Sequence, residues 1–177
     1  MHNYSLHLHI ICAKIQSIIL SGGLYMTKIC CFAGHSKLYN LDEIYHNLVN
    51  LIERLILEEN ISEFWVGNYG DFDKLSAKAV RNLKRKYTDI QLNLIIPYLT
   101  SDINENREIY YQKYDKVLMA DLPERTPKRF QILKCNEYMV DKSDFLICYV
   151  KNNFGGALKT MSYAEKKKHI KILNLSS

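Results

Sequence analysis

The sequence predicts an α/β protein with a Rossmann-like, doubly wound and mostly parallel sheet that carries helices on both faces. Two observations support this fold class. Short apolar runs typical of buried strands alternate along the chain with longer segments whose apolar residues recur at helical spacing. Glycine-bearing segments at residues 32–36, 67–73 and 155–160 stand where a strand would end and a helix begin. Such alternation requires right-handed crossovers between parallel strands.

The first half of the predicted domain contains three strands and two helices. The strands are expected at residues 29–33, 63–66 and 91–96, and the helices at residues 41–59 and 73–87. Asn40 is a candidate N-cap of the first helix, and Pro97 stops the third strand. These elements come in the order strand–helix–strand–helix–strand, which is the order of a parallel sheet.

The second half continues the alternation. Strands are expected at residues 115–119, 145–150 and 170–175, and helices at residues 101–114, 126–141 and 160–168. Pro127 suits the first turn of its helix because that position needs no backbone N–H. Residues 145–150 form the clearest strand of all, an apolar run typical of a buried parallel strand.

Residues 1–25 do not fit the domain pattern, and a single domain is expected over residues 26–177. The apolar stretch in the first segment lacks the Lys/Arg cluster and the cleavage site of a secretory signal. Gly22 and Gly23 can be encoded by a ribosome-binding sequence just before Met26, so we expect the natural start at Met26. The alternatives are a loosely attached extension or an added helix that packs on the domain.

The composition is that of a globular domain, with 47% hydrophobic residues, 24% charged residues and a net charge of +5. Residues 81–86 and 166–169 hold much of the basic excess and are expected at helix ends, where cations complement the dipole. No basic stripe alternates with aromatic residues, so nucleic-acid binding is disfavoured. No apolar run approaches the roughly 20 residues of a membrane span.

The five cysteines form no CxxC pair. Adjacent Cys30 and Cys31 point to opposite faces of a strand and cannot hold one ion together. Unpaired cysteines fit a reducing compartment, so a cytoplasmic location is expected. The six histidines are scattered, and we therefore expect no metal.

The glycine turns predict a pocket for an anionic ligand. Strand-to-helix turns gather along the carboxyl edge of a parallel sheet, where helix N-termini present free backbone N–H groups to a phosphate. Gly34 lets the first turn approach a phosphate or ribose closely, and His35 or Ser36 can donate a hydrogen bond to it.

In the second turn, Gly67 and Gly70 permit a tight bend. Asp71 and Asp73 can accept hydrogen bonds from ribose hydroxyls. The alternative for Asp73 is to cap the following helix, and both remain open.

In the third turn, Gly155 and Gly156 bring backbone N–H groups to a phosphate, while Lys159 and Thr160 add a charge and a hydroxyl. Asn136 can face the pocket from the preceding helix. The alternative is a plain loop. The expected ligand is a phosphate-bearing nucleotide, with no other cofactor.

The order of the segments GHS, GNYGDFD, IPYL, NEYMVDKSDFLICYV and GGALKT resembles the YpsA-like group of the SLOG superfamily. These proteins are Rossmann-like nucleotide-binding domains, and the superfamily also includes DprA and the LOG phosphoribohydrolases. The resemblance covers residues 26–175 and is most specific over residues 136–160. It implies a nucleotide or nucleotide derivative that lies across the carboxyl edge of the sheet.

The LOG hydrolases carry an arginine in the helix before their PGGxGT turn and a glutamate shortly after it. Aligned with that pattern, Cys135 replaces the arginine, no proline precedes Gly155, and Ser162 or Tyr163 occupies the glutamate region. We therefore expect a non-catalytic sensor or regulatory module. The alternatives are a hydrolase that cleaves the glycosidic bond of nucleoside 5′-monophosphates and a DprA-like role in DNA processing. Homo-oligomerisation is left open.

Overall fold

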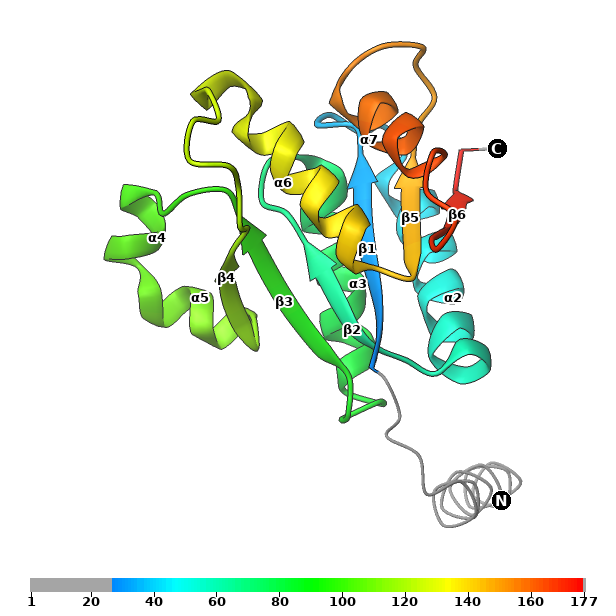
Figure 1. Cartoon of the computed structure of the whole chain (residues 1–177). Helices are drawn as coiled ribbons and strands as arrows, with labels where there is room; N and C mark the ends of the chain where they lie inside the picture. Colours follow the sequence, from blue (N-terminus) through cyan, green and yellow to red (C-terminus); the bar gives the residue numbers. More distant parts are fainter. Residues whose placement is uncertain (1–26, 177) are drawn as a thin grey trace, which may run out of the picture.

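The computed structural model describes residues 27–176. The hypothesis about residues 1–25 lies outside these residues. A six-stranded sheet forms the centre of the described chain, in the order β4-β3-β2-β1-β5-β6 (Figure 1). All five strand pairings are parallel. The strands are β1 (Lys28–Gly34), β2 (Ile61–Val66), β3 (Gln91–Ile96), β4 (Lys116–Met119), β5 (Phe145–Tyr149) and β6 (Lys171–Asn174).

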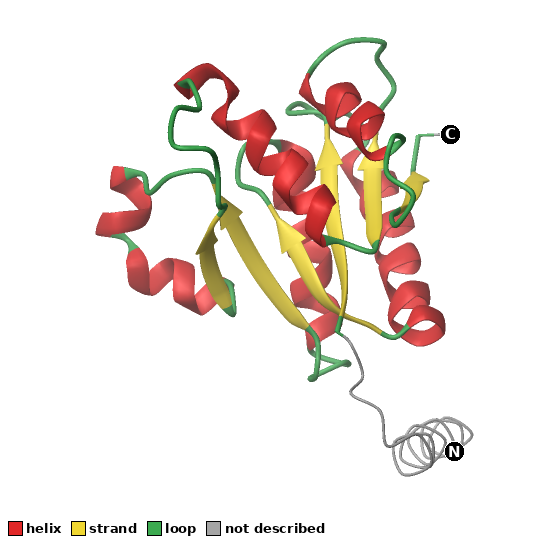
Figure 2. Ribbon diagram, viewed as in Figure 1, coloured by secondary structure: helices red, strands yellow, loops and turns green. Residues whose placement is uncertain are grey.

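Helices cover both faces of the sheet, as Figure 2 shows, so the predicted fold class is confirmed. The described helices are α2 (Leu41–Glu59), α3 (Asp71–Lys84), α4 (Ser101–Glu105), α5 (Arg107–Lys113), α6 (Lys128–Lys142) and α7 (Gly156–Ala164). Cys30 packs in the core under α2 and α3, while Cys31 packs in the core under α6 and α7. The prediction that these two cysteines point to opposite faces is therefore confirmed.

The prediction of α2 and β3 matches the observed bounds, because both have strong apolar periodicity and a clear stop. Asn40 is the N-cap residue of α2, as predicted, but it does not cap the helix with its side chain. Its backbone is left-handed (φ 56°, ψ 48°) and its side chain makes no cap hydrogen bond. The Asn40 carboxamide therefore leaves the first backbone N–H groups of α2 without a side-chain cap.

Three other helix predictions need correction. The single helix expected over residues 101–114 is divided into α4 and α5 at Asn106, whose side chain donates to the Asp102 carbonyl at 3.0 Å. The α7 helix begins at Gly156 and ends at Ala164, so the basic residues 166–169 follow it. The α3 helix begins at Asp71 and ends at Lys84, earlier at both ends than expected.

The strand order reverses beside β1. The strands β2, β3 and β4 extend the sheet on one side of β1, and β5 and β6 extend it on the other. In open α/β sheets, ligands bind outside the carboxyl ends of the strands where the order reverses. The fold therefore predicts a ligand site at the loops that follow β1 and β5. No helix within residues 27–176 is long and apolar enough to cross a membrane.

Candidate functional site

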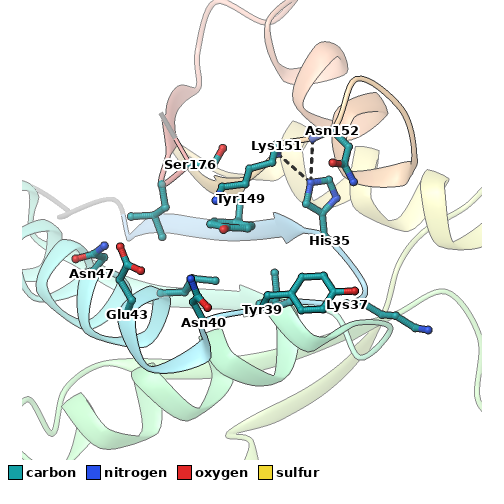
Figure 3. Close-up of a pocket in the computed structure, with 13 residues that line it drawn as sticks. His35, Lys37, Tyr39, Asn40, Glu43, Asn47, Tyr149, Lys151, Asn152 and Ser176 are labelled. Atoms are coloured by element: carbon teal, nitrogen blue, oxygen red, sulfur yellow. Dashed lines mark hydrogen bonds between the residues drawn. The ribbon is translucent and has the colours of Figure 1, made fainter.

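A cavity of about 440 Å³ lies at the carboxyl ends of β1 and β5 (Figure 3). Its walls come from the loop between β1 and α2, the first turns of α2, the end of β5 and the C-terminal segment after β6. The lining side chains used below are His35, Lys37, Tyr39, Asn40, Glu43, Asn47, Tyr149, Lys151 and Ser176. Of these, only His35 belongs to the site predicted from the sequence.

His35 joins the loops that follow β1 and β5. Its Nε2 atom accepts hydrogen bonds from the backbone N–H groups of Lys151 at 2.9 Å and Asn152 at 3.3 Å. The ring also meets Tyr149 edge-on, with 6.2 Å between the centroids. Because Nε2 is an acceptor in this arrangement, only the Nδ1 position of His35 is available to donate to a ligand.

The first and second turns bind each other directly. The Asp71 backbone N–H donates to the Ser36 carbonyl at 3.0 Å, and Asp71 Oδ2 accepts from the Leu38 backbone N–H at 3.2 Å. A Cβ atom at Gly70 would lie 2.9 Å from the Ser36 Cα atom. Gly70 and Asp71 are therefore explained by contacts between the turns, and their predicted ligand contacts remain predictions.

Gly34 is required by the packing of Phe72. A Cβ atom at Gly34 would lie 2.3 Å from Cγ of Phe72. Phe72 is fully buried and stacks on Tyr149 with 6.1 Å between the ring centroids. Close approach to a helix side chain therefore accounts for this glycine without a ligand.

Asp73 lies in the first turn of α3, whose N-cap residue is Gly70, and its side chain binds the backbone just before the helix; its predicted ligand contact remains a prediction. Its Oδ2 atom accepts from the Tyr69 backbone N–H at 2.9 Å, in front of the first turn of α3. A Cβ atom at Gly67 would lie 2.9 Å from the same oxygen, so this glycine leaves room for the carboxylate. Burial raises the pKa of Asp73 from 3.8 to about 6, against the lowering effect of the Tyr69 and Gly70 amides.

The third turn is open. Gly155 has φ 101°, a left-handed conformation that favours glycine, and it precedes the first residue of α7. Nothing lies within 4 Å of a Cβ atom built at Gly155 or Gly156. Lys159 is exposed one turn later. The first N–H groups of a helix have no partner within the helix, so this backbone is accessible to an anion.

Thr160 and Asn136 connect α7 to α6. The Thr160 hydroxyl donates to the Gly156 carbonyl at 3.0 Å, and Asn136 Nδ2 donates to the Thr160 hydroxyl oxygen at 3.4 Å. Thr160 is only 1% exposed. These two residues position the Gly156 turn, and direct contact with a ligand remains a prediction for both.

The start of β5 is held in place by Asp144. Asp144 Oδ2 accepts from the Ile29 backbone N–H at 2.8 Å, and the Asp144 N–H donates to the Ile29 carbonyl. These bonds fix β5 beside β1. They set the register of the two strands whose carboxyl ends border the cavity.

A second hollow, of about 480 Å³, lies where α3 and α5 end. It is lined by Arg81, Lys84, Arg85, Tyr111, Gln112, Lys113, Tyr114 and Asp115. On this surface the ends of α3 and α5, which are distant in the sequence, bring basic and aromatic side chains together. Asp115 accepts from Lys84 at 2.5 Å, and within residues 27–176 the other three cations have no carboxylate within ion-pair distance.

The described part of the chain has no group of three or more His, Cys, Asp or Glu side chains placed to hold a metal ion. The described cysteines are free and buried. Burial raises the pKa of Cys31, Cys135 and Cys148 to about 12, so these thiols are neutral near pH 7.

A sequence model of the YspA SLOG family matches residues 25–175. No curated protein matches the chain significantly. Among solved structures, DNA processing protein A (DprA) from Streptococcus pneumoniae is similar, with a TM-score of 0.62 and 15% identity over 84% of this chain. DNA processing protein A from Helicobacter pylori, whose structure is described with a single-stranded DNA binding mode, has a TM-score of 0.59 and 12% identity over 83% of this chain.

This chain spans 50% of the Streptococcus protein and 64% of the Helicobacter protein. At these identities, the two likenesses concern the fold.

Proposed function

The chain belongs to the YspA SLOG family, and from this premise we propose that it is a non-catalytic domain that binds a nucleotide or nucleotide derivative. The ligand lies at the carboxyl edge of the sheet, between the loops that follow β1 and β5. The observation that carries this proposal is the 440 Å³ cavity at the reversal of the strand order, whose two loops are joined through His35.

The open turn at Gly155 and Gly156 supplies the phosphate contact. This turn follows the loop segment that is hydrogen-bonded to His35. No atom lies within 4 Å of a Cβ atom built at either glycine, so the backbone of the turn is accessible. The N-terminus of α7 carries a partial positive charge that favours an anion. Lys159 adds a full positive charge one turn into the helix.

A binding role is favoured over catalysis by the side chains near the turns. Cys135, at the position where the resemblance places an arginine in hydrolases, is 2% exposed and neutral. The Asp73 carboxylate is engaged with the Tyr69 amide. A glycosidic cleavage needs a carboxyl group that can act on the developing oxocarbenium ion, and this contact makes Asp73 a poor candidate for that role.

Thermal shift measurements test the proposal. The probes are the ribonucleoside 5′-monophosphates, ADP and NAD, and at least one of them should raise the melting temperature by mass action. Gly156→Asp should abolish the shift, because it places a carboxylate where the phosphate binds. The matched control is Asn153→Asp, which adds the same charge to an exposed position of the same loop and should keep the shift.

An unchanged shift in Gly156→Asp would exclude this turn as the phosphate site. The same nucleotides are then incubated with the protein and assayed for released base. Release of base above the buffer rate would replace the binding role with the hydrolase alternative.

Single-stranded nucleic acid is a second candidate ligand, favoured by the basic hollow at the ends of α3 and α5. Cations beside the exposed ring of Tyr111 suit a phosphate backbone with a stacked base. A gel shift with single-stranded DNA at 50 and 200 mM salt tests this role. Arg85→Ala with Lys113→Ala should weaken binding, whereas Lys166→Ala with Lys168→Ala removes equal charge elsewhere and should not. Equal weakening by both pairs would indicate attraction to net charge alone.

A further inference from the structure

We infer that the cavity beside β1 recognises the ribose of the nucleotide through Glu43, Asn40 and Asn47, and that it selects ribonucleotides over deoxyribonucleotides. This inference rests on the proposed function and assigns the sugar to one wall of the same site. Asn40, just before α2, forms a polar row with Glu43 and Asn47 on the helix, next to the apolar row of Ile44 and Leu48. Figure 3 shows the polar row along the wall of the cavity that α2 provides.

These three side chains are available to a ligand. Within residues 27–176, none of them makes a side-chain hydrogen bond or ion pair with the rest of the protein. Asn40 is notable because an asparagine in front of a helix normally caps it. Here the left-handed backbone at φ 56° leaves the carboxamide outside the capping position.

The charge of this wall excludes a phosphate from it. The Glu43 carboxylate repels a phosphate and accepts hydrogen bonds from hydroxyl donors. Lys37 and Lys151 also line the cavity, and they can add positive charge to the phosphate contact proposed at Gly155 and Gly156. A carboxylate can accept from both hydroxyls of a vicinal diol at once, and two carboxamides can donate and accept beside it.

The aromatic residues of the cavity argue for a sugar over a base at this wall. One face of Tyr149 is stacked with Phe72 at 6.1 Å between ring centroids, and Lys151 Nζ lies over the Tyr149 ring at 5.6 Å from the centroid. The ring is only 9% exposed. Tyr149 therefore offers no free face on which a base could stack. Tyr39 is 83% exposed at the rim and is left as the stacking partner for the base outside the sugar pocket.

The test compares the affinities of AMP, GMP, CMP and UMP with those of their 2′-deoxy counterparts. A lost hydrogen bond to a charged group corresponds to about tenfold in affinity. We expect the preferred ribonucleotide to bind about tenfold more tightly than its deoxy form. Glu43→Gln should reduce this ratio towards one by weakening ribonucleotide binding. Asp42→Asn is the matched control, because it removes a carboxylate from the same exposed turn of α2 without touching the cavity.

Three outcomes decide the inference. Equal binding of ribo and deoxy forms by the unchanged protein would overturn it and leave the proposed function standing. A ribonucleotide preference that survives in Glu43→Gln would likewise overturn the assignment to this wall. If none of the eight nucleotides binds, the proposed function fails for monophosphates and the inference falls with it.

Discussion

The backbone N–H of Lys151 donates to Nε2 of His35 at 2.9 Å, across the point where the strand order of the sheet reverses. The bond joins the loop after β1 to the loop after β5, and these strands are neighbours in space although they lie far apart in the sequence. The neighbouring N–H of Asn152 donates to the same nitrogen at 3.3 Å. One imidazole therefore orders the beginning of the loop that leads to Gly155.

Replacement of His35 by alanine should uncouple these two loops. We expect His35→Ala to lower the free energy of unfolding by about 1–2 kcal/mol, since two hydrogen bonds and an edge contact with Tyr149 are lost. The thermal shift produced by nucleotide should disappear. His46→Ala, at an exposed position on α2, should change neither quantity. Full nucleotide binding by His35→Ala would show that the coupling has no role in the site.

Alanine at Gly34 should destabilise the fold through overpacking. The added Cβ would lie 2.3–2.6 Å from Cγ, Cδ1 and Cβ of Phe72, and Cβ is too close to the α3 backbone to move away easily. We expect urea denaturation to show a loss of about 1–3 kcal/mol in the free energy of unfolding. Ser36→Ala, at an exposed position in the same loop, should stay within about 0.5 kcal/mol of the unchanged protein. A similarly small effect at Gly34 would mean that Phe72 can repack.

The fold was readable from the sequence because its strongest signals are local. The apolar rows of α2 and the apolar run of β3 fix those elements to their observed bounds. The sequence predicts the start of α7 too late, because Gly155 and Gly156 are typical of a loop whereas the helix begins at Gly156 itself. A glycine pair lowers helix propensity, yet the Lys159 N–H donates to the Gly155 carbonyl at 3.2 Å, which makes the first turn helical.

The site was less readable because its contacts join distant segments. Nothing near Gly34 in the sequence indicates that Phe72 occupies the space beside it. Likewise, Tyr149 could be recognised only as the end of an apolar strand. Glu43 and Asn47 did leave a signal, since they follow Asn40 at helical spacing and border the apolar face of α2. A polar row beside a core-facing row can mark the wall of a pocket, but it is also normal on any amphipathic helix.

Alanine at Gly155 should destabilise the start of α7 by backbone strain. The observed φ of 101° with ψ of −179° lies in a region that is essentially restricted to glycine. We expect Gly155→Ala to lower the free energy of unfolding by about 1–3 kcal/mol. Gly156→Ala, the neighbouring control, has open space around the added Cβ and should be neutral within about 0.5 kcal/mol. Equal effects at both glycines would contradict the conformation described for this turn.

Asparagine in place of Asp73 should change how stability depends on pH. Burial raises the pKa of Asp73 from 3.8 to about 6 in the folded protein. Between these values the folded protein holds a proton that the unfolded chain has lost, so the unchanged protein loses stability as pH rises through this window. The carboxamide of the variant cannot ionise, yet its carbonyl oxygen can still accept from the Tyr69 N–H.

Relative to the unchanged protein, Asp73→Asn should therefore gain on the order of 1–3 kcal/mol between pH 4 and pH 7. Urea denaturation of both proteins at pH 4, 5, 6 and 7 measures this difference, and titration of the other groups cancels in the comparison. Asp71→Asn is the matched control, since Asp71 lies two residues earlier and accepts a backbone N–H at 3.2 Å. Parallel pH profiles for Asp73→Asn and the unchanged protein would show that Asp73 keeps an ordinary pKa, and the carboxylate would then be ionised in the folded state well below pH 6.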